Sequence, residues 1–406
     1  MKMRKVLFIL TAVVCCLLLW GCKGEAPNSS PTAVPEGNLG VQQEVSIVIS
    51  TPAPTEAPTP VPTPEPTAVP SVVLGGETVP LTDTEVKVES EEEFALLEQF
   101  FALEKADASA LVLSVEQIQA FKSRFPQAEL LCGVKLADRE AGIDAEEWDL
   151  HEVEMTSPDA VMAAAGCLPN LKKVDMRRCG LTNEQMETLV LAYPQVKFVW
   201  EVKMGPHTLR TDIVGFSTKN PGKYTNENSS PEYVEKVKKA VRLTTEDIAV
   251  LKYCTDLVAL DLGHNYIDDI SVLQYLPKLQ ILILADNKLT DISVFRELPE
   301  LVYVEFFMNK VTDLSPLEGH DKLLDLNFCN NDVSNLSPLE GLIQLERVWC
   351  AGNEFSRSDG KALQEKLPNA QVNYTAKDDT ADGWREHERY TWMRAYFKDD
   401  SPYNPS

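Results

Sequence analysis

Histidine, cysteine and carboxylate side chains are the groups in this 406-residue chain that could do acid–base, nucleophilic or metal chemistry. Among the five histidines, His151 is followed by Glu152, but the sequence HEVEM does not continue as the zinc-binding pattern HExxH. No GxSxG turn, glycine-rich phosphate loop or EF-hand calcium loop occurs in the sequence. We therefore expect no catalytic residue, no cofactor and no metal site.

The spacing of the nine cysteines also gives no sign of a metal site. Cys15 and Cys16 lie in an apolar N-terminal run, and Cys22 follows that run directly. The other six show no CxxC pair and no metal-ligand spacing, and they are Cys132, Cys167, Cys179, Cys254, Cys329 and Cys350. We expect them to be mostly free thiols that pack as small hydrophobic side chains.

The charge of the chain excludes one class of partner. The sequence holds 62 Asp and Glu against 38 Lys and Arg, which gives a formal net charge of −24. Nucleic-acid binding requires a basic face that neutralises phosphates. We therefore expect no nucleic-acid partner.

The second half of the chain contains a sequence repeat with a constant period, whose units start at Leu257, Leu279, Leu301, Leu323 and Leu345. The units begin LVALDLGHN, LQILILADN, LVYVEFFMN, LLDLNFCNN and LERVWCAGN, and they share the template L-x-x-L-x-L-x-x-N. The asparagine recurs at Asn265, Asn287, Asn309, Asn331 and Asn353. An amide at the end of each strand can donate to and accept from backbone groups that no strand pairing satisfies. We interpret this asparagine ladder as structural and not as a set of metal ligands.

The tail of each unit repeats as well, as in IDDISVLQYL and LTDISVFREL. An acidic or amide residue, Asp269, Asp291, Asp313 or Asn335, stands two positions before a serine in four successive units. Such residues favour the start of a short helical turn. Each unit is then a short strand, a bend and a return segment, which buries its apolar face only against neighbouring units.

This template resembles the leucine-rich repeat family, in the 22-residue bacterial form of the internalins, and the whole chain resembles clostridial leucine-rich repeat lipoproteins. The resemblance implies an α/β fold: a leucine-rich repeat solenoid, or horseshoe, with a parallel β-sheet on its concave face. It covers residues 235–374 as the repeat array. Residues 76–206 form degenerate α/β repeats, because LKKVDMRRCGL fits the template and FPQAELLCGVKL, from Phe125, returns as YPQVKFVWEVKM, from Tyr193. We expect a long loop at 207–234 and a C-terminal cap at 375–406.

The N-terminus has the features of a bacterial lipoprotein signal. A basic start, an apolar run and the sequence Leu19-Trp20-Gly21-Cys22 resemble a lipobox, in which the cysteine becomes the lipid-carrying first residue. We expect a signal peptide over 1–21 and a disordered Pro/Thr-rich linker over 22–75, where residues 51–70 contain eight prolines. Such a spacer favours display through the wall of a Gram-positive type of bacterium, on the outer face of its membrane.

The residues that the template leaves free are the candidate binding site. Template positions three and five, and Phe307 at position seven, are expected to project from the concave face between the inward leucines. They form a broken apolar patch with a charged rim, which is typical of a protein-binding surface. The predicted set is Ile281, Ile283, Tyr303, Glu305, Phe307, Asp325, Asn327, Arg347 and Trp349. The alternative is that these side chains pack internally, for example beneath the 207–234 loop.

These patterns predict a monomeric, lipid-anchored surface protein that binds an extracellular protein or peptide. Two other hypotheses remain open at this stage. A wall-associated structural scaffold would be retained by purified wall, whereas a wall-active enzyme would turn over a wall fragment. Repeat folds do not dictate a ligand, so the choice depends on the site.

Overall fold

A computed structural model describes residues 69–398 of the chain. The predicted signal peptide, the proposed lipidation site Cys22 and most of the predicted linker lie outside the described residues. No helix within 69–398 has the length and apolar character that crossing a membrane requires.

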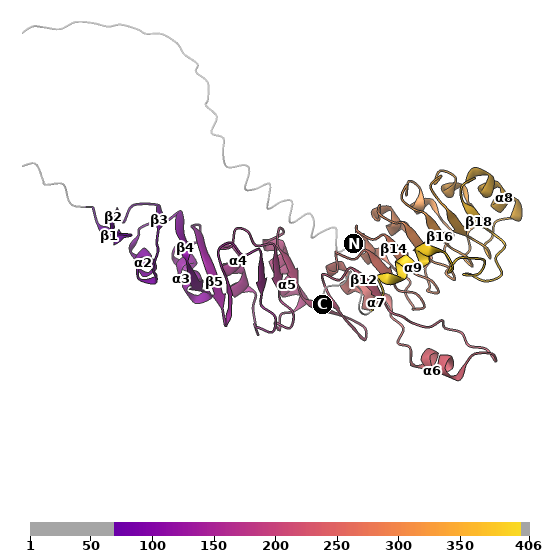
Figure 1. The fold of residues 1–406 in the computed structure, drawn as a ribbon, viewed down its shortest axis with the longest axis horizontal. Helices are drawn as coiled ribbons and strands as arrows, with labels where there is room; N and C mark the ends of the chain where they lie inside the picture. The colour runs from indigo at the N-terminus through magenta and orange to yellow at the C-terminus, as the bar shows by residue number, and fades with distance from the viewer. Residues whose placement is uncertain (1–68, 399–406) are drawn as a thin grey trace, which may run out of the picture. The chain divides into compact units, whose positions relative to one another are not determined.

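A seven-stranded parallel sheet forms the C-terminal half, as the leucine-rich repeat prediction requires (Figure 1). Its strands lie in chain order and are β12 (Gly215–Ser217), β13 (Ala259–Asp261), β14 (Ile281–Ile283), β15 (Tyr303–Glu305), β16 (Asp325–Asn327), β17 (Arg347–Trp349) and β18 (Gln371–Asn373). From β13 to β17 each residue pairs with its equivalent in the next unit of the repeat. The sequence period and the strand register therefore coincide, and the fold prediction is confirmed.

Each strand of the array returns through a short helical turn. These turns are α7 (Thr245–Ile248) with η2 (Ala249–Tyr253), then η3 (Ser271–Tyr275), η4 (Ser293–Glu297), η5 (Ser315–Leu317), η6 (Ser337–Leu339) and finally the longer α8 (Arg357–Lys366). The carboxylate of Asp291 accepts from the backbone N–H of Ser293 at 2.7 Å, and the other three members of this series make the equivalent bond. The leucines between strand and turn form one continuous buried core.

The N-terminal half of the described chain contains a four-stranded and a three-stranded sheet, two separate hairpins and four α-helices. One sheet joins β3 (Glu85–Lys87), β4 (Lys105–Ser114), β5 (Glu129–Leu136) and β6 (Arg139–Ala141), and the other joins β7 (Glu147–Asp149), β8 (Lys173–Asp175) and β9 (Lys197–Val199). The helical elements are α2 (Glu91–Leu96), η1 (Leu97–Gln99), α3 (Val115–Arg124), α4 (Asp159–Ala165) and α5 (Asn183–Ala192). This half shares the continuous core of the array, as degenerate α/β repeats should. The six cysteines of the described chain are all buried free thiols, as predicted.

A hairpin followed by a strand that opens a new parallel sheet occurs three times. The hairpins are β1 (Ser71–Leu74) with β2 (Glu77–Pro80), β5 with β6, and β10 (Glu201–Met204) with β11 (His207–Arg210), and the opening strands are β3, β7 and β12. Helices α3 and α5, which precede the second and third hairpins, begin at Val115 and Asn183 and so have the same spacing as the duplicated sequences. The duplication seen in the sequence therefore includes the hairpins.

These hairpin units correct two predicted boundaries. Strand β1 begins at Ser71, so the folded chain includes residues that we assigned to a disordered linker ending at 75. Residues 207–217 form β11 and β12 instead of a loop, and α6 (Pro231–Lys239) follows. The polar composition of 207–234 concealed a strand because β12 has only Phe216 as a large apolar residue in its three positions.

The C-terminal segment lies over the concave face of the array. Helix α9 (Glu388–Ala395), yellow in Figure 1, lies in front of the sheet near β14 and β16. The end of the array is formed by α8 and β18, whereas residues after 375 contact strands in its middle. We name residues 376–397 the covering segment.

Candidate interaction site on the concave face

Alternation along the strands separates two apolar clusters. The central residue of each strand, such as Val304 in β15, belongs to the main core. Its neighbours at template positions three, five and seven point to the opposite side, as a pleated strand requires. There they form a second cluster with Trp384 and Met393 of the covering segment.

The structure brings the nine predicted binding residues together but leaves them covered. Eight of them are at most 5% exposed, and Ile283 is half-buried. They pack internally, which was the alternative interpretation, although the cover is the C-terminal segment and not the 207–234 segment. In this closed arrangement a partner cannot reach them, so their role in binding a partner remains a prediction.

Trp384 is the anchor of the covering segment. Its indole is fully buried and lies 5.6 Å from the ring of Tyr303 and 5.1 Å from that of Trp349, centroid to centroid. The guanidinium of Arg347 lies 4.5 Å from the centroid of the Trp384 ring, within the range of a cation–π contact. Trp384 Nε1 donates to Glu305 Oε1 at 2.7 Å, so the only polar atom of the indole is satisfied.

Side chains of β16 and β17 hold the backbone of the covering segment. Asn327 Nδ2 donates to the carbonyl of Asp379 at 2.7 Å, Trp349 Nε1 donates to that of Ala381 at 2.9 Å, and Arg347 Nη1 donates to that of Trp384 at 2.9 Å. Glu305 of β15 adds the indole contact. The face therefore holds this segment of the same chain through three backbone carbonyls as well as through the Trp384 indole, and the segment adds no strand to the sheet.

An ion-pair cluster fixes helix α9. Arg389 contacts the carboxylates of Asp325 and Glu346, and Arg347 Nε donates to Asp325 Oδ1 at 2.7 Å. Asp325 is fully buried, so two guanidinium groups compensate its desolvation. Met393 then closes the apolar cluster on the inner side of α9.

Burial changes the acid–base chemistry of this face. It raises the pKa of the Glu305 carboxyl, although Tyr303 and Trp384 both donate hydrogen bonds to that group. Burial also raises the pKa of Asp261 despite the hydrogen bond from Ser217, and it holds the pKa of the Tyr303 hydroxyl well above its ordinary value. The concave face is thus a poorly solvated acidic surface that favours cationic and hydrogen-bond-donating groups.

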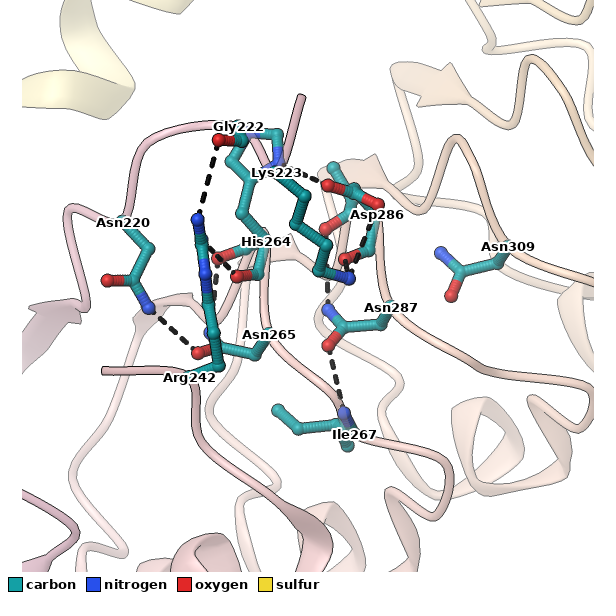
Figure 2. A network of polar contacts seen from close by, with 12 residues as sticks. Asn220, Gly222, Lys223, Arg242, His264, Asn265, Ile267, Asp286, Asn287 and Asn309 are labelled. Carbon is teal, nitrogen blue, oxygen red and sulfur yellow. Dashed lines mark hydrogen bonds and ion pairs between the residues drawn. The ribbon is translucent and has the colours of Figure 1, made fainter. Parts of the chain in front are cut away.

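The five ladder asparagines make repeated backbone contacts at the end of the strands. Asn287 Nδ2 donates to the carbonyls of Leu262, Leu284 and Ala285, and its Oδ1 accepts the N–H of Ile267 at 3.1 Å (Figure 2). Asn309 and Asn331 repeat this arrangement in the next two units. Both ends of these amides are therefore occupied by backbone groups, as a structural role requires.

Residues 218–242 lie along this asparagine edge. Lys223 Nζ donates to the carbonyl of Asp286 at 2.6 Å, and His264 Nδ1 lies 3.0 Å from Asp286 Oδ2 (Figure 2). Arg242 Nη1 donates to the carbonyls of Pro221 and His264 at 2.6 Å. These contacts attach the segment to the ends of strands β13 and β14.

The sequence did not reveal the groups that cover this face, which are the side chains of Trp384 and Arg389 and the backbone carbonyls of Asp379, Ala381 and Trp384. The helical spacing of Tyr390, Met393 and Phe397 predicted a C-terminal cap over the last repeat, and that position was wrong because the segment packs on the concave face and reaches β15. One signal in the sequence was available. The aromatic and acidic residues at free template positions are chemically complementary to the tryptophan and arginine of the C-terminal segment. Within 69–398, no cluster of three His, Cys, Asp or Glu could hold a metal ion.

Comparisons with known proteins support the repeat through one family model. The model of leucine-rich repeats in two copies matches residues 277–319, whereas no curated protein matches. Among solved structures, internalin C2 of Listeria monocytogenes is 20% identical, with 58% of this chain and 85% of that chain covered and a TM-score of 0.29. A leucine-rich repeat protein of Leptospira interrogans is 19% identical, with 68% and 74% covered and a TM-score of 0.31. The match at 277–319 spans β14 and β15, so this chain is similar there to the leucine-rich repeat family and carries its fold.

Proposed function

We propose that this protein is a lipid-anchored surface protein that binds an extracellular protein or peptide on the concave face of its repeat array. The observation that carries the proposal is that this face already holds a peptide segment. Asn327, Arg347 and Trp349 donate to three backbone carbonyls, which any peptide can supply. None of these three side chains is required by the repeat template.

The apolar and charged groups of the face add selectivity to backbone binding. Tyr303, Phe307 and Trp349 provide an aromatic surface, and Asp325 with Glu305 provides buried carboxylates. Aromatic anchors within a water-excluding polar surround are the usual source of affinity at protein interfaces. A wall scaffold or a wall-active enzyme gains no comparable support from this arrangement.

Site-specific photo-cross-linking on intact cells tests the binding. A photoreactive phenylalanine analogue replaces Ile283 on the concave face of the full-length chain carrying Trp384→Ala, a substitution that we expect to free that face. The matched control places it at Val190, which is 37% exposed on α5. We expect a discrete cross-link to a separate protein only from position 283. The same products from both positions, or none from 283, would contradict the proposal.

The anchor is tested separately. Cys22→Ala removes the sulfur that would carry the lipid. We expect the variant to move from the membrane fraction to the soluble fraction, because buried hydrocarbon supplies the membrane affinity of such anchors. Cys16→Ala is the control and should leave the distribution unchanged. Retention of the Cys22 variant in the membrane fraction would remove the anchor from the proposal.

A further inference from the structure

We propose that the covering segment is a built-in competitor for the binding site, and that the partner which displaces it carries the same chemistry. That partner is a protein segment with a tryptophan and, five positions later, an arginine, as Trp384 and Arg389 stand in this chain. The inference rests on the proposed function and specifies its ligand and its regulation.

The indole site is built from residues that the repeat does not need. Tyr303, Glu305 and Trp349 occupy free template positions, yet all three contact the Trp384 ring or its N–H. In β13, two repeats before β15, the positions equivalent to Tyr303 and Glu305 hold Ala259 and Asp261. The indole pocket is therefore local to the centre of the face.

Charge complementarity selects the second feature of the ligand. Asp261, Glu305 and Asp325 are carboxylates that the strands contribute to the concave face, and Arg347 is the cation among the nine predicted residues. The covering segment supplies Arg389 to Asp325, and it places Arg385 where its charge opposes the rise that burial causes in the pKa of Glu305. An acidic ligand would instead leave buried carboxylates opposite like charges, which is a costly arrangement.

The covering segment can leave without opening the main core. It contacts the second apolar cluster, whereas the leucine core of the array contains no residue beyond Val372 among its buried members. Within the described chain no strand pairing joins it to the sheet. The connection turns at Asp382 and Gly383, whose φ angles are +59° and +95°, and this turn directs Trp384 into its pocket.

A labelled peptide of residues 376–398 measures the competition directly. Its affinity is determined for the full-length wild type, for Trp384→Ala and for Trp392→Ala. Trp392 is the matched control, since it lies in the covering segment as well but is 38% exposed. A second opening variant, Arg389→Glu, changes a charge at the rim and leaves both apolar clusters intact.

We expect Trp384→Ala and Arg389→Glu to bind the peptide about 10-fold or more tightly than the wild type, because apparent affinity scales with the open fraction. Trp392→Ala should match the wild type. A peptide in which Trp384 is replaced by Ala, or Arg389 by Glu, should not bind the opened chain. Equal affinities for all four proteins, or equal binding of the altered peptides, would overturn the inference.

Further outcomes distinguish this inference from exchange with a second copy of the chain and from the proposed surface function. Concentration-dependent dimers of the wild type that disappear when the covering segment is altered would overturn it in favour of exchange with a second copy. Peptide binding as expected, with no cross-link from position 283 on cells, would remove the proposed surface function and leave the competitor intact. Cross-linking from position 283 without peptide binding would overturn the competitor and leave the proposed surface function intact.

Discussion

Trp384 and Glu305 are 79 residues apart in the sequence, yet the indole N–H of one donates to the carboxylate of the other at 2.7 Å. This contact joins the C-terminal segment to the central strand of the array. It gives a reason for the aromatic and acidic residues on the outward face of β15, which the repeat template leaves unexplained. The face is complementary to the covering segment, which belongs to the same chain.

The raised pKa of Glu305 makes this closure dependent on pH. Burial raises the pKa from an ordinary value of 4.5, so closing takes up a proton. Closure should be strongest below about pH 4.5 and should weaken as the pH rises through the raised pKa. We expect the hydrogen-exchange protection factors of residues 376–397 to fall as the pH rises above about 4.5 and through the raised pKa of Glu305.

The variant Glu305→Gln isolates that contribution, because an amide oxygen still accepts from Trp384 but does not titrate. In this variant the hydrogen-exchange protection of residues 376–397 should depend less steeply on pH. The pH dependence that remains in this variant should come from Asp261 and Asp379, whose pKa values are also raised by burial. Tyr303 faces the same carboxyl, and it does not titrate over this range because burial holds its pKa well above the ordinary value. Protection that rises with pH, or an unchanged slope in the variant, would count against the assignment.

Each asparagine of the ladder should contribute strongly to the stability of the array. Asn331→Ala removes three donated bonds and leaves the N–H of Val311 buried without its acceptor. We expect the free energy of unfolding to fall by about 2–4 kcal/mol. Asn335→Ala is the control, since it loses one exposed turn bond and should cost about 1 kcal/mol. Similar losses from both substitutions in denaturant titrations would contradict the structural role.

Asp286 should hold residues 218–242 against the array. Burial alone would raise its pKa, but His264 and Lys223 hold the pKa below its ordinary value of 3.8. Its stabilising effect is therefore present above about pH 3.8 and is lost as the pH falls through the lowered pKa. Asp286→Asn at neutral pH leaves the Lys223 ammonium buried without its carboxylate.

Hydrogen exchange measures that effect. Residues 218–242 should exchange several-fold faster in Asp286→Asn, while the strands β15 to β17 stay unchanged. Asp332→Asn is the matched control, because Asp332 pairs with Lys310 only at the surface. Unchanged exchange in Asp286→Asn would show that the other contacts of the segment suffice.

The periodic part of the fold could be predicted from the sequence because stacking repeats the same contacts. Each leucine of L-x-x-L-x-L-x-x-N meets its equivalent in the next unit, so the sheet order and the asparagine ladder follow from spacing alone. The hairpin units were partly visible as the duplication that starts at Phe125 and Tyr193. Their strands were missed at 207–217, where polar residues such as Thr208 and Ser217 replace the usual apolar ones.

The state of the concave face could not be predicted in the same way. Tyr303 and Trp349 were correctly placed opposite the leucine core, but Trp384 belongs to no repeat and meets them only once. A single contact between distant parts of the chain leaves no period in the sequence. Sequence patterns therefore indicate which side chains share the face, whereas the three-dimensional arrangement decides what covers them.

Thiol labelling at Cys329 tests the central claim most directly. Cys329 lies beneath the covering segment, and burial raises its pKa to about 12, while Cys350 lies in the leucine core and serves as an internal control. We expect iodoacetamide, mapped by mass spectrometry, to label Cys329 about 10-fold or more faster in Trp384→Ala than in wild type or Trp392→Ala, with Cys350 unchanged. Cys329 remaining unreactive in Trp384→Ala, or Cys329 and Cys350 becoming reactive together, would contradict a concave face that opens by release of its own C-terminal segment.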